Sequence, residues 1–282
     1  MDLDALCKKA EAFRRMHDRN RILVLPNAWD AMSARIFEAA GFKAIATTSA
    51  GVSYAIGYPD GELIPRDEMV AAVARIARCV DVPVTADMES GFGRHPDEVA
   101  ETVRLVIAAG AVGLNLEDTV HGGGRTLHEI SAAAERIRSA REAADAAGVP
   151  VVINARTDVY LLGIGEKASR FDHAVTRLNA YSAAGADCLF AMGYFDADTI
   201  CRLVKAVDGP LNVMGVPGMP PVAELESLGV AWVSTASGPT RVAMTATRRS
   251  VDELMRTGSF DVFGGDTMSH QDANALMEKR RA

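Results

Sequence analysis

Short apolar runs alternate with amphipathic stretches along most of this chain. The runs are four or five residues long and rich in Val, Ile, Leu and Ala, which is typical of buried strands. The stretches between them carry apolar residues at helical spacing among Glu, Arg and Ala. We predict strands at Ile22–Leu25, Ala44–Thr48, Val82–Ala86, Val112–Leu116, Val151–Asn154, Cys188–Ala191, Leu211–Met214 and Ala231–Thr235, and helices at Asp67–Cys79, Pro96–Ala109, His128–Ala147, Arg170–Ala184 and Asp198–Val207.

Strands that alternate with helices of this length form βαβ units and a parallel sheet. Eight units predict an α/β fold closed into a (β/α)8 barrel, the TIM barrel, and 282 residues suit one such barrel. Two further helices are predicted at Arg241–Thr257 and Ser269–Arg280. Because no Pro/Ser-rich linker divides the chain, we expect one domain over residues 1–282, with the barrel at about 20–240 and a helical extension at 241–282.

Acidic residues stand at the carboxyl ends of neighbouring predicted strands. Asp87 and Glu89 follow the third run, Glu117 follows the fourth, and Asp60 lies in the loop after the second. In a (β/α)8 barrel these strand ends meet at one mouth, where active sites are built. Carboxylate oxygens suit Mg²⁺, with Mn²⁺ as an alternative ion, so these four acids predict a metal site. Solvated loop acids are the alternative interpretation.

Arg156 follows the fifth run and is a candidate for binding the substrate. Its planar guanidinium suits two-point binding of a carboxylate. An ion pair with Asp158 or with a barrel acid is the structural alternative. Asn212, in the seventh run, is either a donor to a substrate oxygen or a residue that satisfies the backbone.

Two loops near the predicted mouth offer further contacts. Thr48, Ser49 and Ala50 leave the second run beside a glycine, where small residues and exposed amide groups can hold a carbonyl oxygen or a carboxylate. His121 and Arg125 flank three glycines after the fourth run, so this loop is either a lid that delivers an acid or a flexible surface turn.

Composition narrows the class of protein. Hydrophobic residues make up 49% of the chain and charged residues 24%, which is enough for a large core. The net charge of −7 disfavours nucleic acid, whose partners are usually basic. No apolar run is long enough to span a bilayer, and the N-terminus lacks the apolar stretch of a signal peptide. We therefore expect a cytoplasmic protein that acts on a small anionic molecule, without a membrane or nucleic-acid partner.

Several motifs together resemble the isocitrate lyase/phosphoenolpyruvate mutase superfamily, and its methylisocitrate lyases in particular. They are PNAWDAMSAR, GYPD, TADMESGFG, GLNLEDT and INARTD, and the resemblance covers about Arg21 to Gly238. It implies a barrel that binds Mg²⁺ and a 2-oxo acid or its enolate. It also implies homo-oligomers, dimers or more commonly tetramers, in which subunits exchange their last helix.

The same resemblance implies roles for individual residues. Asp87 would touch the metal, and Asp60, Glu89 and Glu117 would hold its waters. The turn Thr48–Ala50 would hold the oxo acid, and Arg156 would contact the substrate.

Departures from the family pattern narrow the activity. The lyases carry a KKCGH loop after the fourth strand, whose cysteine supplies a proton, whereas residues 119–125 here contain neither cysteine nor lysine. The mutases have a gating loop with Lys and Asn there and a histidine after the sixth strand, whereas the matching position here is Met192. Glu89 replaces the usual second Asp.

These observations favour a Mg²⁺-dependent lyase that cleaves a C–C bond through an enolate intermediate. The substrate would be a 2-oxo acid or a related 2-hydroxy diacid, as in oxaloacetate decarboxylases or malate- and citrate-type lyases. Arg156, Glu117 and His121 are the catalytic candidates, with Tyr54 as a further candidate base. C–P bond chemistry on phosphonopyruvate, by a hydrolase or mutase, and a non-catalytic 2-oxo acid binding protein are the alternatives.

Overall fold

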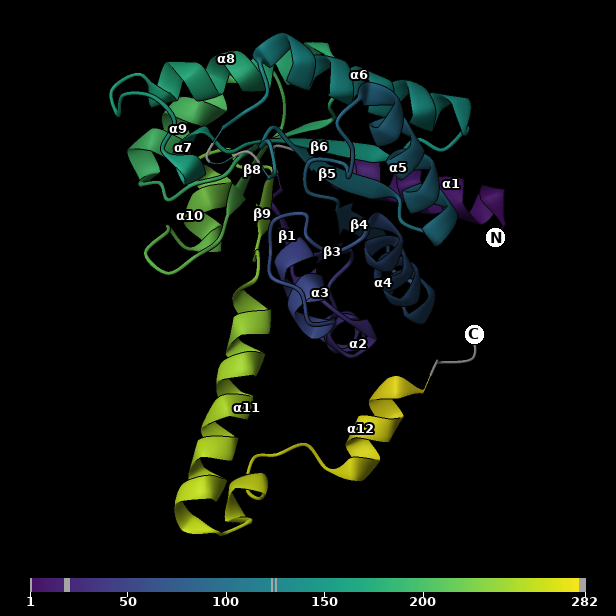
Figure 1. Ribbon diagram of the computed structural model, residues 1–282, viewed down its shortest axis with the longest axis vertical. Coiled ribbons are helices and arrows are strands. Elements are labelled where there is room, and N and C mark those ends of the chain that lie inside the picture. The colour runs from purple at the N-terminus through teal and green to yellow at the C-terminus, as the bar shows by residue number, and fades with distance from the viewer. Residues whose placement is uncertain (1, 18–20, 123, 125, 279–282) are drawn as a thin grey trace.

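Nine parallel strands form a nearly closed barrel in the computed structural model, which describes residues 2–17, 21–122, 124 and 126–278 (Figure 1). Their order is β1-β9-β8-β7-β6-β5-β4-β3-β2. The strands are β1 (Leu23–Leu25), β2 (Asn27–Ala28), β3 (Ile45–Thr47), β4 (Val84–Asp87), β5 (Gly113–Glu117), β6 (Val152–Thr157), β7 (Cys188–Ala191), β8 (Leu211–Met214) and β9 (Trp232–Ser234). The predicted barrel is confirmed, and each predicted run contains or overlaps one of its strands.

Two short strands, one on each side of Pro26, close the barrel near the first predicted strand. β1 pairs with β9, and β2 pairs with β3. Because Pro26 has no N–H group, it interrupts the hydrogen-bonded ladder at this point. The chain therefore joins both edges of the sheet within a few residues.

Three strands extend beyond their predicted ends. Asp87 is the last residue of β4 and pairs with Asn115. Glu117 ends β5 and lies opposite Arg156 of β6. Hydrophobic runs end where the polar site begins, whereas the backbone ladder continues into the site. These charged residues are therefore held by the sheet itself rather than by loops.

Helices cover the outer face of the barrel (Figure 1). The five helices predicted between the strands are present, and their ends differ from the prediction by at most two residues. The described helices are α1 (Leu3–Arg15), α2 (Ala31–Ala39), α3 (Ser49–Ala55), α4 (Arg66–Cys79), α5 (Pro96–Ala109), α6 (Ile130–Ala146), α7 (Val159–Leu162), α8 (Arg170–Ala183), α9 (Ala197–Ala206), α10 (Val222–Ser227), α11 (Gly238–Thr257) and α12 (His270–Met277), with the 3-10 helix η1 (Asp261–Phe263). None of these described helices has the length and apolar character needed to cross a membrane.

Helix α1 packs at the amino-terminal end of the strands. The Phe13 ring lies edge-on to Trp232 with ring centroids 6.2 Å apart. Gly113 at the start of β5 must be small, because a Cβ there would lie 2.8 Å from both Phe13 Cε1 and Thr85 Oγ1. Packed side chains fill this end of the barrel. The opposite end, the mouth at the carboxyl ends of the strands, carries the candidate site residues.

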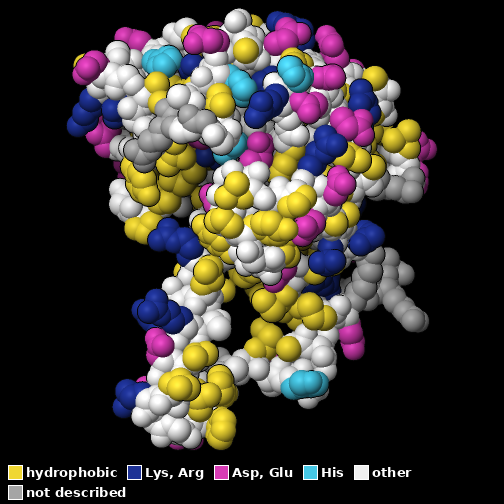
Figure 2. All heavy atoms as spheres, in the orientation of Figure 1, with side chains coloured by type: hydrophobic (Ala, Val, Ile, Leu, Met, Phe, Trp, Pro, Cys, Tyr) yellow, Lys and Arg dark blue, Asp and Glu magenta, His cyan; other side chains and the backbone are white. Residues whose placement is uncertain are grey.

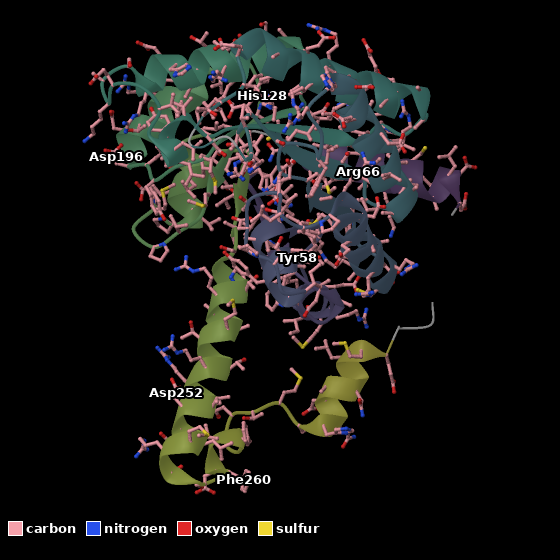
Figure 3. The ribbon with its side chains drawn as sticks, viewed as in Figure 1. Tyr58, Arg66, His128, Asp196, Asp252 and Phe260 are labelled. Atoms are coloured by element: carbon pink, nitrogen blue, oxygen red, sulfur yellow. The ribbon has the colours of Figure 1, made fainter. Side chains whose placement is uncertain are left out.

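The C-terminal segment leaves the barrel as an arm made of α11, η1 and α12 (Figure 1). Helix α12 returns to α2, where Arg35 Nε donates to the Leu276 carbonyl at 3.0 Å. Figures 2 and 3 show the arm standing away from the barrel, with Phe260 near its far end. The two predicted helices of the extension, Arg241–Thr257 and Ser269–Arg280, correspond to α11, which begins three residues earlier, and to α12, which ends at Met277; the predicted residues 279–280 lie outside the described residues.

Candidate active site

A cavity of about 290 Å³ opens at the carboxyl ends of the strands. One side of it is polar and is lined by Ser49, Asp60, Asp87 and Arg156. Thr48 and Ala50 also line it, so the predicted small-residue turn is at the mouth. The turn is the first turn of α3, and the Thr48 side chain accepts from the Gly51 N–H at 3.4 Å. A helix start capped in this way was missed by the sequence pattern because the segment has few apolar residues.

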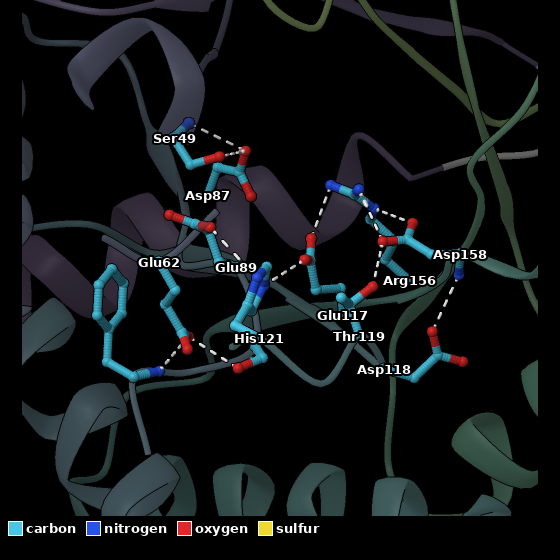
Figure 4. A network of polar contacts seen from close by, with 12 residues as sticks. Ser49, Glu62, Asp87, Glu89, Glu117, Asp118, Thr119, His121, Arg156 and Asp158 are labelled. Atoms are coloured by element: carbon cyan, nitrogen blue, oxygen red, sulfur yellow. Dashed lines mark hydrogen bonds and ion pairs between the residues drawn. The ribbon is translucent and has the colours of Figure 1, made fainter. Parts of the chain in front are cut away.

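One carboxylate oxygen of Asp87 accepts hydrogen bonds, and the other accepts none among the described residues. Its Oδ2 accepts from the Ser49 N–H at 3.1 Å and from Ser49 Oγ at 2.9 Å (Figure 4). Its Oδ1 is buried and accepts from no group in the described part of the chain. The side chain is fixed further by its own N–H, which donates to Thr47 Oγ1 at 2.8 Å. A buried carboxylate oxygen without a donor is unfavourable by itself, so this oxygen suits a cation.

Glu89 is a second buried carboxylate with an unused oxygen. The residue is 2% exposed, and within the described structure no group reaches Glu89 Oε1. Burial raises its pKa to about 9, with the charges of Glu117 and Asp87 adding to the shift. Its φ of 49° is a left-handed conformation that costs a non-glycine residue on the order of 1–3 kcal/mol. Strain of this kind at a polar mouth is typical of functional residues.

The loop that carries Glu89 is clamped from both sides. Glu62 Oε1 accepts from Ser90 Oγ at 2.8 Å and from the Phe92 N–H at 2.7 Å. Arg136 of α6 reaches the same loop and donates to the carbonyls of Ser90, Gly93 and Arg94. Because these contacts fix residues 90–94, directly after Glu89, they help to hold its strained conformation in place.

On the prediction that the acids at the mouth bind Mg²⁺, we expect Arg136→Lys to weaken that binding about tenfold while the protein stays folded. A lysine ammonium keeps the charge but lacks the planar fork that bridges several carbonyls, and loss of such supporting contacts typically lowers metal affinity 10–100-fold. Calorimetric titration with Mg²⁺ measures the effect. Arg138→Lys is the matched control, since Arg138 is on the same helix in an exposed pair with Glu135. Equal affinities in the two variants would contradict this role.

His121, Glu117 and Arg156 form a chain of charged contacts (Figure 4). The His121 Nε2 atom lies 2.9 Å from Glu117 Oε1 and 3.8 Å from a Glu89 oxygen. Glu117 Oε2 lies 2.8 Å from Arg156 Nη1. Ligand atoms of Glu89, Glu117 and His121 all lie within 4.8 Å of one another, a spacing that could hold a metal ion.

The pKa values of Glu117 and His121 are both displaced upward. Burial raises the pKa of Glu117 to about 7, although the nearby Arg156 charge opposes this shift. Burial lowers the pKa of His121, but its hydrogen bond to Glu117 and the charge of that carboxylate outweigh burial, so the net pKa is raised. The pair can therefore exchange a proton near neutral pH, which is the property of a general acid or base.

Arg156 lines the cavity, but much of its guanidinium is already bound. Nε lies 2.6 Å from Asp158 Oδ1, and Nη2 donates to Oδ2 at 2.9 Å. With the contact to Glu117, three of its five N–H donors are used within the described structure, which leaves two for a substrate. The structural alternative, an ion pair with Asp158, is thus present, and substrate binding by Arg156 stays a prediction.

Behind Arg156 and Asp158 lies a layer of supporting residues, Asp118, Thr119, Arg177 and Tyr181, that were not among the predicted site residues. Thr119 Oγ1 donates to Asp158 Oδ2 at 2.6 Å. Asp118 accepts from the Asp158 N–H at 2.9 Å and from Tyr181 Oη at 2.7 Å. Arg177 also lies 3.2 Å from Asp118. The signal for both acids was their position close after predicted site residues: Asp118 directly follows Glu117 in GLNLEDT, and Asp158 stands two residues after Arg156 in INARTD.

The remaining candidates lie in different environments. Asp60 is an exposed residue at the rim, and its pKa is raised by partial burial of the carboxyl and by the charge of Asp87. Asn212 is 0% exposed inside the barrel, where neither side-chain amide atom finds a partner among the described residues. Met214, two residues further along β8, lines the cavity instead. A role of Asn212 in substrate binding stays a prediction.

The loop after β5 forms a short hairpin. The Val120 N–H donates to the Thr126 carbonyl at 3.0 Å, and Thr119 pairs with Leu127 in an isolated bridge. His121 lines a second hollow of about 470 Å³ together with Glu62 and Ser90 rather than the main cavity. The predicted clamp residue Arg125 lies outside the described residues.

A protein family, several relatives and a solved structure are similar to this chain over most of its length. The family model described as phosphoenolpyruvate phosphomutase matches residues 13–255. The chain is 32% identical to 2,3-dimethylmalate lyase of Eubacterium barkeri over 95% of this chain and 93% of that one. It is 30% identical to oxaloacetate decarboxylase of Bradyrhizobium sp. strain BTAi1, covering 74% and 72% of the two chains. A solved structure from Burkholderia cenocepacia J2315 is 39% identical with a TM-score of 0.89, and the match covers 96% of each chain.

Proposed function

The chain belongs to the phosphoenolpyruvate phosphomutase family, within the isocitrate lyase/phosphoenolpyruvate mutase superfamily, and on this premise we propose that it is a Mg²⁺-dependent carbon–carbon lyase. Its substrate would be a 2-oxo acid or a related 2-hydroxy diacid, cleaved through an enolate. The relatives named as a dimethylmalate lyase and an oxaloacetate decarboxylase support this reaction class.

One observation carries the proposal. Asp87 Oδ1 and Glu89 Oε1 are both buried without a partner in the described structure, beside an arginine that has unused donors. Two unpaired acidic oxygens fit a hydrated hard cation: Asp87 would contact the metal, and Asp60, Glu89 and Glu117 would hold its waters. Bound Mg²⁺ would supply Lewis-acid stabilisation of the negative charge that develops on the oxo oxygen.

The side chains at the mouth define how this chain would act on the substrate. The two unused N–H donors of Arg156 and the first turn of α3 at Ser49 would orient the oxo-acid end. When a 2-oxo acid such as oxaloacetate loses CO₂, the electron pair of the broken C–C bond stays on the oxo-acid fragment as an enolate, which then takes a proton on carbon. The proton-exchanging pair of His121 and Glu117 is the source of that proton in our proposal, in place of the cysteine that this loop lacks.

With a 2-hydroxy diacid the electron pair instead stays on the other fragment, as the enolate of its carboxylate, because the hydroxyl carbon becomes the carbonyl of the released oxo acid. This reaction needs one more step, removal of the hydroxyl proton. Glu117 fits this role because its pKa of about 7 lets it accept a proton near neutral pH. Tyr54, the other candidate base, is 39% exposed and does not belong to this charged network in the described structure. We therefore favour Glu117 over Tyr54 as the base.

Binding of oxalate, a planar mimic of the enolate, tests the proposal. We expect oxalate to bind only when Mg²⁺ is present, and turnover to produce carbon–carbon cleavage products from a panel of oxaloacetate and substituted malates. Release of phosphate from phosphonopyruvate would instead favour C–P chemistry. Oxalate binding without turnover of any panel member would favour a binding protein.

Mg²⁺ affinity should rise with pH between about 6.5 and 9. The raised pKa values of Glu117, about 7, and Glu89, about 9, mean that the metal-free site holds protons at neutral pH. Metal ligands must be deprotonated, so binding releases these protons and becomes tighter as pH passes each pKa. Calorimetry in buffers of different ionisation enthalpy counts the released protons. Glu89→Gln should remove the rise above pH 7.5, and a flat profile in the wild type would refute the assignment.

We also propose that the protein forms a homo-oligomer, a dimer or tetramer, through its C-terminal arm. The arm exposes several large apolar side chains, which favour burial against another subunit: Val242, Met244, Val251, Met255, Phe260, Phe263 and Met268. Exchange of α12 between subunits is the arrangement that the family resemblance implies. Light scattering of the full chain measures the subunit number.

A further inference from the structure

The cavity at the mouth has a charged half and an apolar half, and it is also lined by a polar segment at β9 and the start of α11, with Ser234, Thr235, Ser237 and Arg241. The half formed by β2 to β6 carries the charged groups described above. The other half, formed by α7, β7, β8 and the turn after β8, presents apolar side chains to the same space, among them Leu161, Phe190, Met192 and Val216. Phe190 stands at the boundary, since Arg156 Cζ lies 5.9 Å from its ring centroid.

Much of this apolar wall belongs to the strands of the barrel rather than to a loop. Phe190 lies within β7, Met214 is the last residue of β8, and both are buried. The Met192 N–H donates to the Thr157 carbonyl at 3.2 Å, which continues the ladder past β7, and the Gly215 N–H donates to the Ser234 carbonyl at 2.8 Å. The wall is therefore held in the cavity by backbone hydrogen bonds on both strands.

A purely polar substrate would leave the apolar half without a matching group. In oxaloacetate a carboxylate stands at each end, so placing one end at the charged half directs the other toward the apolar wall, or toward Arg241 and leaves the wall to water. Removing a carboxylate from water without a partner is strongly unfavourable, whereas an alkyl group gains about 25 cal/mol per Å² of apolar surface buried. Methionine side chains also adapt their shape to such a group.

We propose that the substrate carries an apolar substituent, an alkyl or aryl group, that packs against Phe190, Met192, Met214 and Val216. This inference rests on the proposed function, because it assumes that the oxo-acid end binds at the charged half. It narrows the substrate class from small diacids in general to 2-oxo or 2-hydroxy acids with an apolar branch or chain.

A series of 2-oxo acids measures the contribution of the wall. Calorimetry with saturating Mg²⁺ should give an affinity that rises about fourfold per added methylene from pyruvate to 2-oxobutyrate to 2-oxopentanoate. The matched ligand 2-oxoglutarate has a carboxylate where 2-oxopentanoate has a methyl group, and it should bind more weakly. Oxalate, which has no substituent, serves as the reference for the charged half alone.

Met192→Gln tests the wall directly, because it keeps the length of the side chain and adds a polar end. It should reduce the advantage of 2-oxopentanoate over pyruvate at least threefold and leave oxalate affinity unchanged. Met244→Gln is the matched control, on the exposed arm helix α11. It should leave the whole series unchanged.

Two results would overturn the inference. One is an affinity that does not change along the series. The other is tighter binding of 2-oxoglutarate that is lost in Arg241→Gln, since Arg241 also lines the cavity and would then hold a distal carboxylate. Failure of the wild type to bind oxalate with Mg²⁺ would instead refute the proposed function, so the two failures are distinguishable.

Discussion

Asp87→Ala is expected to abolish Mg²⁺-dependent turnover. Asp87 Oδ1 is the buried oxygen at the mouth that is left for a cation, and its partner oxygen is fixed by Ser49. Loss of a direct ligand removes several kcal/mol of charge stabilisation, which corresponds to a fall in kcat of roughly a thousandfold or more. Glu89→Gln and Asp60→Asn should have smaller effects, about tenfold, if these residues act through water.

Two further variants serve as controls for Asp87→Ala, one at the same position and one at an exposed acid. Asp87→Asn keeps an acceptor for the Ser49 N–H and removes the charge, so it serves if the alanine variant unfolds. Asp252→Ala, in an exposed position on α11 (Figure 3), should leave metal binding and turnover unchanged. If calorimetry showed equal Mg²⁺ and oxalate binding by the wild type and Asp87→Asn, Asp87 would not be the metal ligand.

The sequence was sufficient to place the charged residues at one mouth because barrel geometry leaves few choices. Asp87, Glu117 and Arg156 lie at the ends of consecutive parallel strands, and parallel strands bring consecutive ends side by side. The pairing of Glu117 with Arg156 in the ladder is the direct result. Periodicity could not show where the strands end, because the apolar pattern stops at the site while the backbone ladder continues.

Other features depend on how deep a side chain lies in the barrel and on its partners, which a linear pattern does not contain. Asn212 and Met214 share one face of β8, yet only Met214, at the carboxyl end of the strand, is among the described residues that line the cavity. The orientation of Arg156 toward Asp158 depends on Asp118, which fixes the Asp158 backbone from the adjacent strand end. The clamp formed by Arg136 joins α6 to the loop after β4, a contact that no local motif signals.

Arg156→Met should lower both stability and activity. Glu117 and Asp158 are buried, and without Arg156 they would lose their close cationic partner. Removing one member of a buried ion pair typically costs about 3–5 kcal/mol, which corresponds to a fall in Tm on the order of 10 °C for a chain of this size. Arg138→Met, which breaks an exposed pair, should change stability by less than about 1 kcal/mol.

The pH dependence of this loss separates charge from packing. Burial already raises the pKa of Glu117 to about 7 against the opposing charge of Arg156, so removing Arg156 raises that pKa further. The folded variant then holds a proton that the unfolded chain releases at lower pH, so its stability falls as pH rises through 7. The stability deficit relative to wild type should therefore be smaller at pH 5.5 than at pH 8. A deficit independent of pH would indicate lost packing against Phe190 instead.

Arg156→Lys distinguishes a catalytic role of Arg156 from a structural one. Lysine keeps the positive charge beside Glu117, so most of the stability should remain, but it cannot bind Asp158 through two parallel hydrogen bonds and still present donors to a substrate. We expect kcat/KM to fall about tenfold or more, which corresponds to at least about 1.4 kcal/mol of transition-state stabilisation. Normal turnover combined with a much lower Tm would show that Arg156 serves only to pair the buried acids.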